Sequence, residues 1–280
     1  MRLFVASALF AGLFVAQADQ EFLVTLERAT AENAAAELAT KTTLAKSAYK
    51  TADFVQFTKA QVEGLGGARG SPELLKDVYN AYVGAIGENR DALFVIRKQL
   101  PELSKTEDGK KAAEEYLKKV ETETTTLCDE AIALLAAFNG LEETGPKLTA
   151  LRLNADLLRY KLEVVKESGD DAAKGQLAAE AKQAYEALES ATSQLEGDAL
   201  VTSEVVGAMN NQLLFEFQQA KEAGTPEAMT PVCEKAKGSK TKIEEVYKKK
   251  QFDKDAAETL HAADPNIAKL STNIEIFCVA

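Results

Sequence analysis

The chain has 280 residues and a formal net charge of −11 at pH 7, with 46% hydrophobic and 28% charged side chains. This composition predicts a folded chain with a sizeable core and excludes an intrinsically disordered one. An acidic chain has no general attraction to nucleic acid or to an anionic membrane surface, so neither is expected as a partner.

The N-terminal stretch "MRLFVASALFAGLFVAQA" has the pattern of a secretory signal peptide. It carries one basic residue, Arg2, an apolar run over 3–16, and small residues at Ala16 and Ala18. The run is short for a membrane span, and the small residues predict cleavage after Ala18. The alternative is an uncleaved N-terminal anchor. We expect a mature chain over 19–280 that enters the secretory pathway or the extracellular space and is not held in a membrane.

Histidine and cysteine usage argues against an enzyme or a metal protein. His261 is the only histidine, which excludes a histidine-based triad or a multi-histidine metal site, and no cofactor is expected. Cys128, Cys233 and Cys278 have neither disulfide-framework nor zinc spacing. Cys128 lies in an amphipathic segment and is predicted to be a buried thiol. A bridge between Cys233 and Cys278 stays open.

Strand patterns are nearly absent, and long segments rich in Ala, Leu, Glu and Lys lie between glycine and proline breaks. Ser71 before Pro72 and Thr225 before Pro226 are typical helix starts. The pattern predicts an all-α fold in one domain over 19–280. The nine expected helices span 21–47, 51–63, 71–99, 106–138, 146–168, 172–195, 199–222, 226–249 and 256–277.

The segment "LRLNADLLRYKLEVV" places two stripes side by side on one predicted helix. One stripe is apolar and the other alternates in charge. The charged stripe has two interpretations, a solvated row of ion pairs or the wall of a binding groove. The apolar stripe consists of Leu153, Leu157, Tyr160 and Val164, and the charged one of Arg152, Asp156, Arg159 and Glu163.

Two further segments are more specific, "PELLKDVYNAYVGA" over 72–85 and "YLKKVETETTTLCDEAIALLAAF" over 116–138. Together they resemble the third and fourth helices of the 14-3-3 family, and weaker similarity continues to about residue 278. The resemblance implies nine antiparallel helices and a non-enzymatic, dimeric adaptor. Such a protein binds phosphorylated segments of partner proteins in an amphipathic groove. The alanine-rich segment over 29–49 also suits close packing against a second copy.

The family's functional residues carry over only in part. Arg159 and Tyr160 match its phosphate-binding arginine–tyrosine pair, and Arg152 stands where the family has a lysine. Asn210 and Asn273 match the asparagines that hold the peptide backbone, and Ile276 and Phe277 match apolar groove residues. On the third helix, Asn80 and Gly87 replace a lysine and an arginine. Arg90, one turn beyond Gly87, is the candidate to restore part of that charge.

Three functions remain for the structure to weigh. The first is an adaptor whose groove binds acidic or phosphorylated peptides with an incomplete phosphate site. The second is a structural protein that keeps the fold and the dimer and acts through its outer surface, without phosphopeptide recognition. The third is a helical carrier of apolar ligands.

Overall fold

The computed structural model describes residues 51–165, 171–250 and 257–278, and all regular structure in these ranges is helical. This confirms the all-α fold class. The described residues form eight α-helices and two short 3-10 helices, so the count of nine is slightly off for this part of the chain. The expected signal peptide and the expected helix over 21–47 lie outside the described residues.

The chain forms two compact units, and each is described by itself. The first contains a helix over 51–63, α4 (Pro72–Leu103), α5 (Glu107–Leu135) with the short η1 (Ala136–Phe138), and the end of α6 (Thr144–Val165). The second contains the rest of α6 and nearly all of α7 (Asp171–Thr192). It also contains η2 (Gly197–Val201), α8 (Ser203–Ala223), α9 (Pro226–Lys250) and α10 (Ala257–Cys278). The division between the units falls inside α6. Arg159 is the last residue of α6 in the second unit, and Tyr160 is the first residue of α6 in the first unit.

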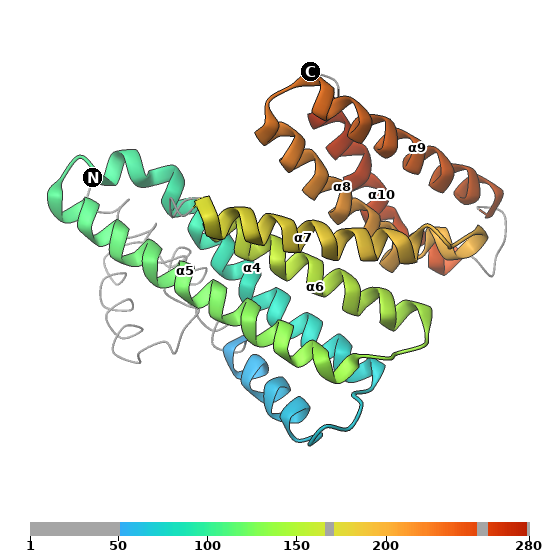
Figure 1. Cartoon of the computed structure of the whole chain (residues 1–280), viewed down its shortest axis with the longest axis horizontal. Coiled ribbons are helices and arrows are strands. Elements are labelled where there is room, and N and C mark those ends of the chain that lie inside the picture. Colours follow the sequence, from blue (N-terminus) through green and yellow to red (C-terminus); the bar gives the residue numbers. More distant parts are fainter. Residues whose placement is uncertain (1–50, 166–170, 251–256, 279–280) are drawn as a thin grey trace, which may run out of the picture. The chain divides into compact units, whose positions relative to one another are not determined.

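In the first unit, α4 and α5 run side by side in opposite directions (Figure 1). The helix α4 begins as its sequence predicts, because the Ser71 hydroxyl accepts a hydrogen bond from the Leu74 amide at 3.2 Å and Pro72 takes the first helical position. Apolar side chains from α4, α5 and the end of α6 share one core cluster, consisting of Ala92, Leu93, Ile96, Tyr116, Val120 and Val164.

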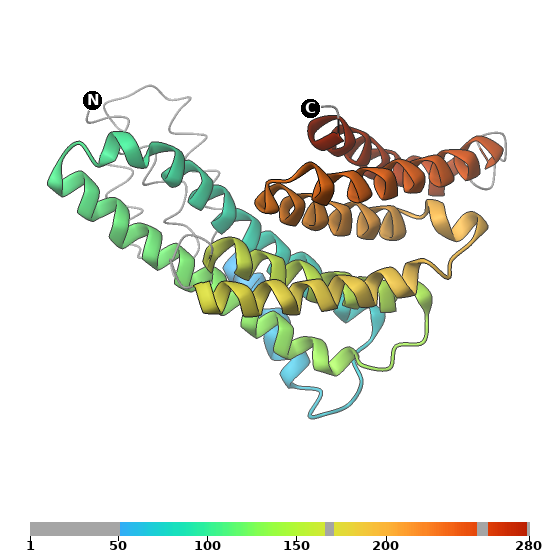
Figure 2. The same ribbon diagram turned by 45° about the horizontal axis from the view of Figure 1, so that its top comes forward.

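In the second unit, α8, α9 and α10 lie side by side (Figure 2). Their shared core includes Leu213 and Phe217 of α8, Ile243 of α9 and Leu270 of α10. The expected helix over 199–222 begins later than predicted. Residues 197–201 form η2 instead, and the Thr202 hydroxyl caps α8 by accepting from the Val205 amide.

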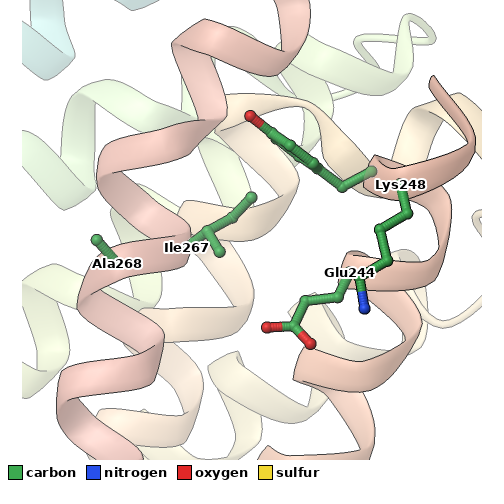
Figure 3. A pocket seen from close by; sticks show the side chains of 5 residues that line it. Glu244, Lys248, Ile267 and Ala268 are labelled. Atoms are coloured by element: carbon green, nitrogen blue, oxygen red, sulfur yellow. The ribbon is translucent and has the colours of Figure 1, made fainter. Parts of the chain in front are cut away.

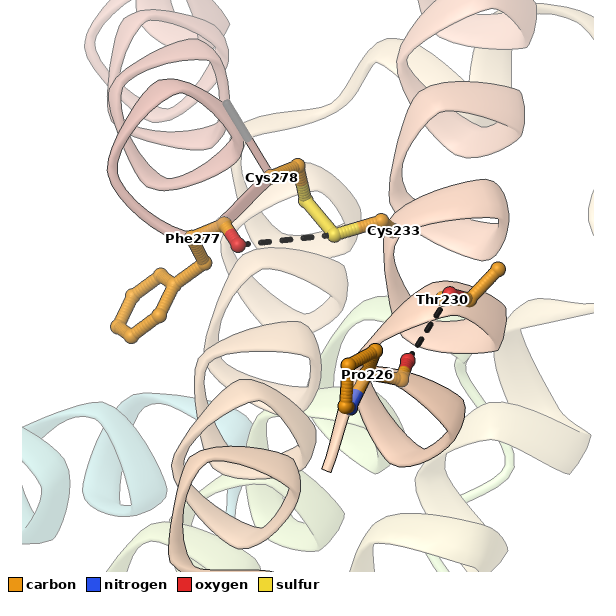
Figure 4. Close-up of a disulfide and its surroundings, with 5 residues drawn as sticks. All are labelled: Pro226, Thr230, Cys233, Phe277 and Cys278. Atoms are coloured by element: carbon orange, nitrogen blue, oxygen red, sulfur yellow. Dashed lines mark hydrogen bonds between the residues drawn. A yellow bond between two sulfur atoms is a disulfide. The ribbon is translucent and has the colours of Figure 1, made fainter. Parts of the chain in front are cut away.

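A disulfide joins Cys233 of α9 to Cys278 at the end of α10, with a Cα–Cα distance of 5.6 Å (Figure 4). This settles the pairing that the sequence left open. The bridge links two residues that are 45 positions apart in the sequence, and it fixes the last turn of α10 to α9. Cys128 is fully buried, as predicted, and burial raises the pKa of its thiol to about 12. The Cys128 thiol is therefore unreactive at neutral pH.

Candidate functional site

The apolar stripe of α6 is confirmed. Leu153, Leu157, Tyr160 and Val164 are all buried, with at most 7% of any side chain exposed. The charged stripe matches neither simple interpretation. Asp156 and Arg159 are 1% and 4% exposed, which makes them core residues, whereas Glu163 is only partly buried.

Arg159 is bound within the second unit. Its Nε donates a hydrogen bond to the hydroxyl of Tyr185 at 3.1 Å, and its Nη2 lies 3.8 Å from Oδ1 of Asp156. One of the two interpretations of the charged stripe placed this pair at the surface, whereas the structure places it in the interior. The positive charge of Arg159 is thus matched by a carboxylate three residues away on the same helix.

Asp156 is the centre of this buried network. Its Oδ1 accepts from the Tyr185 hydroxyl at 2.6 Å and its Oδ2 from the Asn211 amide at 2.7 Å, while the Nε of Arg152 lies 3.5 Å from Oδ2. Burial, followed by the Asp156 charge, raises the pKa of Tyr185 well above its ordinary value, so the phenol stays protonated and donates. The Asp156 carboxylate thus has hydrogen-bond donors or cations on both of its oxygens, as a buried polar group requires.

Sequence reasoning missed three residues around this network. Tyr185 and Asn211 lie 29 and 55 residues from Asp156, and no local pattern links them to it. Gly207 of α8 is the third. A Cβ at that position would lie 2.6 Å from Nη1 of Arg152, so the glycine leaves the space that the guanidinium occupies.

The two expected backbone-holding asparagines meet each other. The Asn273 amide donates to Oδ1 of Asn210 at 2.8 Å, and Asn210 is only 5% exposed. Their contact joins α8 to α10. The two asparagines that the resemblance pointed to are thus neighbours in the structure. A peptide that bound them would have to replace the hydrogen bond between them.

The apolar residues at the end of α10 have different environments. Phe277 stacks on Phe217 with ring centroids 4.8 Å apart and planes inclined by 9°, and it packs against the core of the second unit. Ile276 is 62% exposed. The Cys233 sulfur lies 3.8 Å from the Phe277 carbonyl oxygen (Figure 4). A disulfide sulfur carries no proton, so this is a packing contact. Of this pair, Ile276 is the residue available to a ligand.

Tyr160 belongs to the first unit and is covered by Arg90 of α4. The Arg90 Cζ lies 4.3 Å from the centroid of the Tyr160 ring, and its Nε donates to Oε2 of Glu163 at 2.8 Å. A guanidinium over an aromatic face gains a cation–π contact and is held in place by the carboxylate. Arg90 therefore does lie against the tyrosine of the expected site.

Asn80 and Gly87 are the two positions of α4 where the resemblance leads us to expect cations. Asn80 is exposed, and a Cβ added at Gly87 would meet nothing within 4 Å. The space next to the Gly87 backbone is therefore open to a Cβ. Gly87 lies inside the continuous helix α4, so the absent charge there is a difference of residue type within a regular helix.

The residues that the structure describes contain no group of His, Cys, Asp or Glu side chains arranged to hold a metal ion. Within the same ranges, no helix combines the length and apolar character that a membrane crossing requires.

These observations define an antiparallel, all-helical protein whose candidate site consists of charged and amide side chains. A model of the family described as "14-3-3 protein" matches residues 41–269, and the chain therefore belongs to the 14-3-3 family. It is 32% identical over 163 residues to 14-3-3 protein beta/alpha-A and to 14-3-3 protein beta/alpha-B, both of Xenopus laevis. The matched part covers 57% of this chain and 64% of each relative, which is less than two thirds of their length.

Proposed function

We propose that this protein is a non-enzymatic adaptor that binds extended acidic or phosphorylated peptide segments of other proteins, with a phosphate site weaker than that expected for its family. Family membership supports peptide binding. The single observation that carries the weakening is the buried pair of Arg159 with Asp156, because a guanidinium already matched by a carboxylate gains less from an external phosphate. Asn80 and Gly87 add no charge to compensate.

The proposed peptide contacts are those of the second unit. In the second unit, Asn210 and Asn273 would open their mutual bond to hold peptide amides, Ile276 would contact an apolar residue, and Arg152 would face the anion. The first unit is considered by itself, and there Tyr160, which Arg90 covers, would offer its hydroxyl to an anion. Each charge-assisted hydrogen bond to phosphate is worth about 1.5–3 kcal/mol, so the loss of two cations is expected to weaken affinity by about a hundredfold or more.

Fluorescence anisotropy tests this proposal. A labelled twelve-residue peptide with a central serine is titrated in serine, phosphoserine and glutamate forms against the protein from secretory expression, with its disulfide intact. We expect micromolar or weaker binding, tightest for phosphoserine. The double variant Asn210→Ala/Asn273→Ala removes both partners of one hydrogen bond, so it leaves no orphaned group. It should weaken all forms that bind, whereas the exposed-loop control Asn139→Ala should not.

A second candidate is a scaffold that keeps the family fold and acts through its outer surface without reading phosphopeptides. The observation that favours it is the same closure of the expected site, namely Arg159 matched inside and Asn210 bonded to Asn273. Absence of binding for all three peptide forms would favour the scaffold and reject the adaptor.

Export and dimerisation complete the proposal. A Cys233–Cys278 disulfide is typical of an oxidising compartment, and this agrees with a signal peptide over 1–18. N-terminal sequencing of the protein recovered from the medium of expressing cells should begin at Asp19. Light scattering at micromolar concentration should give twice the mass of the chain, and a monomeric mass would reject the dimer.

A further inference from the structure

A hollow of about 430 Å³ lies on the first unit, between α4 and the end of α6. We call it the α4–α6 hollow. Its charged lining consists of Arg90, Arg97 and Lys98 from α4 and Glu163 from α6. Three cations against one carboxylate are unusual in a chain with 44 acidic and 33 basic residues. Glu121 of α5 pairs with Arg97 from outside the lining, so the hollow keeps an excess of one positive charge, which Lys98 supplies.

Two other hollows among the described residues lack this excess. One between α9 and α10 has a single carboxylate, Glu244, and a single ammonium, Lys248, on α9 opposite Ile267 and Ala268 of α10 (Figure 3). Another, formed by α7, α8 and the start of α9, has one lysine against three glutamates. An anionic ligand is thus favoured at the α4–α6 hollow and disfavoured at the α7–α9 one.

The cations of the α4–α6 hollow retain unused hydrogen-bond donors. Arg90 donates Nε to Glu163, and Arg97 donates Nη2 to Glu121 at 3.2 Å. A guanidinium has five N–H donors in a fixed fork, so most of the donors of each arginine stay available. Lys98 is exposed, and no carboxylate among the described residues lies within ion-pair distance of it. Arg90 and Arg97 are seven residues apart, which puts them two helical turns apart on one side of α4.

The hollow also has an apolar part. Leu93 and Val164 are buried in its floor, and Phe94 lines it with 69% of the side chain exposed. Exposure of a phenylalanine to water is unfavourable, and contact with an apolar group of a ligand would reduce it. A ligand that matches both the charged and the apolar lining of the hollow has an anionic group next to an apolar group.

We infer that the α4–α6 hollow binds an anionic peptide segment in which a phosphorylated or acidic residue stands one or two positions from a leucine or phenylalanine. The anion contacts Arg90, Arg97 and Lys98, and the apolar residue covers Phe94. The inference rests on the proposed adaptor function and supplies the cations that Asn80 and Gly87 lack. A hollow of this volume accommodates one or two side chains, which suits a peptide better than a nucleic acid or a lipid surface.

The test uses two labelled twelve-residue peptides with a central phosphoserine, one with leucine two positions later and one with glycine there. The variant Arg97→Gln/Lys98→Gln removes two charges from the hollow. Its matched control, Lys110→Gln/Lys111→Gln on the exposed start of α5, changes the net charge equally. We expect the Kd of the leucine peptide to rise tenfold or more in the first variant and less than twofold in the control. Glutamate in place of phosphoserine distinguishes a carboxylate ligand from a phosphoryl one.

A second variant tests the apolar contact. Phe94→Ser should weaken the leucine peptide at least threefold and leave the glycine peptide unchanged, and it should fold normally because Phe94 is exposed. Peptide binding that is lost in Asn210→Ala/Asn273→Ala but unchanged in Arg97→Gln/Lys98→Gln would overturn the inference and leave the adaptor function standing. If no peptide bound the unaltered protein, the adaptor function would fail and the inference with it.

Discussion

Two arginine environments in this molecule differ in what they leave for a ligand. Arg159 in the second unit is 4% exposed and shares a buried network with Asp156 and Tyr185. Arg90 in the first unit has 36% of its side chain exposed and uses one N–H for Glu163. Similarity to the family selects Arg159 as the phosphate ligand. Both arginines are paired with a carboxylate, so the difference is accessibility, and the comparison teaches that a matching residue type acts on an external anion only where the fold leaves its guanidinium exposed.

The largest expected effect is a difference in unfolding free energy between removal of the buried Arg159 and removal of a partly exposed arginine of the α4–α6 hollow. Arg159→Ala should lower the free energy of unfolding by about 3–5 kcal/mol, because it removes a buried guanidinium that contacts Asp156 and Tyr185 and leaves Arg152 as the one cation beside the carboxylate among the described residues. Arg97→Ala breaks a partly exposed pair with Glu121 and should cost no more than about 1 kcal/mol. Urea denaturation measures both. A cost below about 1 kcal/mol for Arg159→Ala would contradict a buried structural role.

This result also decides how Arg159 can be used in binding assays. Because Arg159→Ala is expected to destabilise the fold, loss of peptide binding in that variant would not identify a phosphate contact. The double variant Asp156→Asn/Arg159→Met removes both charges of the pair. It should cost less than the sum of Asp156→Asn and Arg159→Met measured singly.

The next effect concerns the end of α10, where Ile276 and Phe277 lie. The double variant Cys233→Ser/Cys278→Ser should lose about 2–4 kcal/mol of unfolding free energy, because the bridge closes a loop with a sequence separation of 45. Reductant should bring the unaltered protein to the same urea midpoint. Equal midpoints with and without reductant would mean that the bridge does not stabilise the second unit.

A smaller effect tests whether Gly87 only lacks a charge or also weakens α4. Gly87→Ala should stabilise the protein by about 1 kcal/mol, because alanine favours a helix interior and its Cβ would meet nothing within 4 Å. Gly70→Ala is the opposite control, since its Cβ would overlap the Phe138 ring. The midpoint temperature of thermal unfolding should rise for Gly87→Ala and fall for Gly70→Ala. A lower midpoint for Gly87→Ala would show that the glycine is required.

The smallest effect appears in the pH dependence of stability. Burial raises the pKa of Glu123 on α5 above 4.5, and its Oε2 has no hydrogen-bond partner among the described residues. Because its pKa is raised, the Glu123 carboxylate costs stability when it is ionised. The contribution of protonated Glu123 to stability is fully present at a pH below the pKa of the unfolded chain, near 4.5. It is lost as the pH rises through the higher pKa of the folded protein.

Glu123→Gln should therefore gain stability relative to the unaltered protein as the pH is raised from 4 to 7. Urea midpoints across that range measure the gain. Glu114→Gln, on the exposed side of α5, is the control and should follow the unaltered protein. A constant difference between the Glu123→Gln variant and the unaltered protein would mean that Glu123 titrates alike in the folded and unfolded states.

Much of the fold could be predicted from the sequence because its signals are local. Ser71 and Thr225 cap the helices that they were expected to begin, each by accepting from an amide three residues later. Thr202 has the same capping role. The apolar residues just before it favoured a helix, so the predicted start at residue 199 came before the observed start of α8 at Ser203.

The candidate site could be predicted less well because its partners are distant in sequence. Nothing near Arg159 indicates that Tyr185, 26 residues later, and Asn211 complete a buried network with Asp156. The Cys233–Cys278 pairing likewise depends on how α9 meets α10. Arg90 was accessible to prediction because it lies one turn beyond Gly87 on the same helix face.

The most direct test asks which arginine meets the anion. Protein with 15N-labelled arginine side chains is titrated with the leucine phosphopeptide, and the Nε–H resonances are followed by NMR. Arginine-to-lysine substitutions assign the few signals, which come from positions 2, 28, 69, 90, 97, 152 and 159 in the full chain. We predict that Arg90 and Arg97 shift with peptide while Arg159 does not. A shift at Arg159 with Arg90 and Arg97 unchanged would contradict the account.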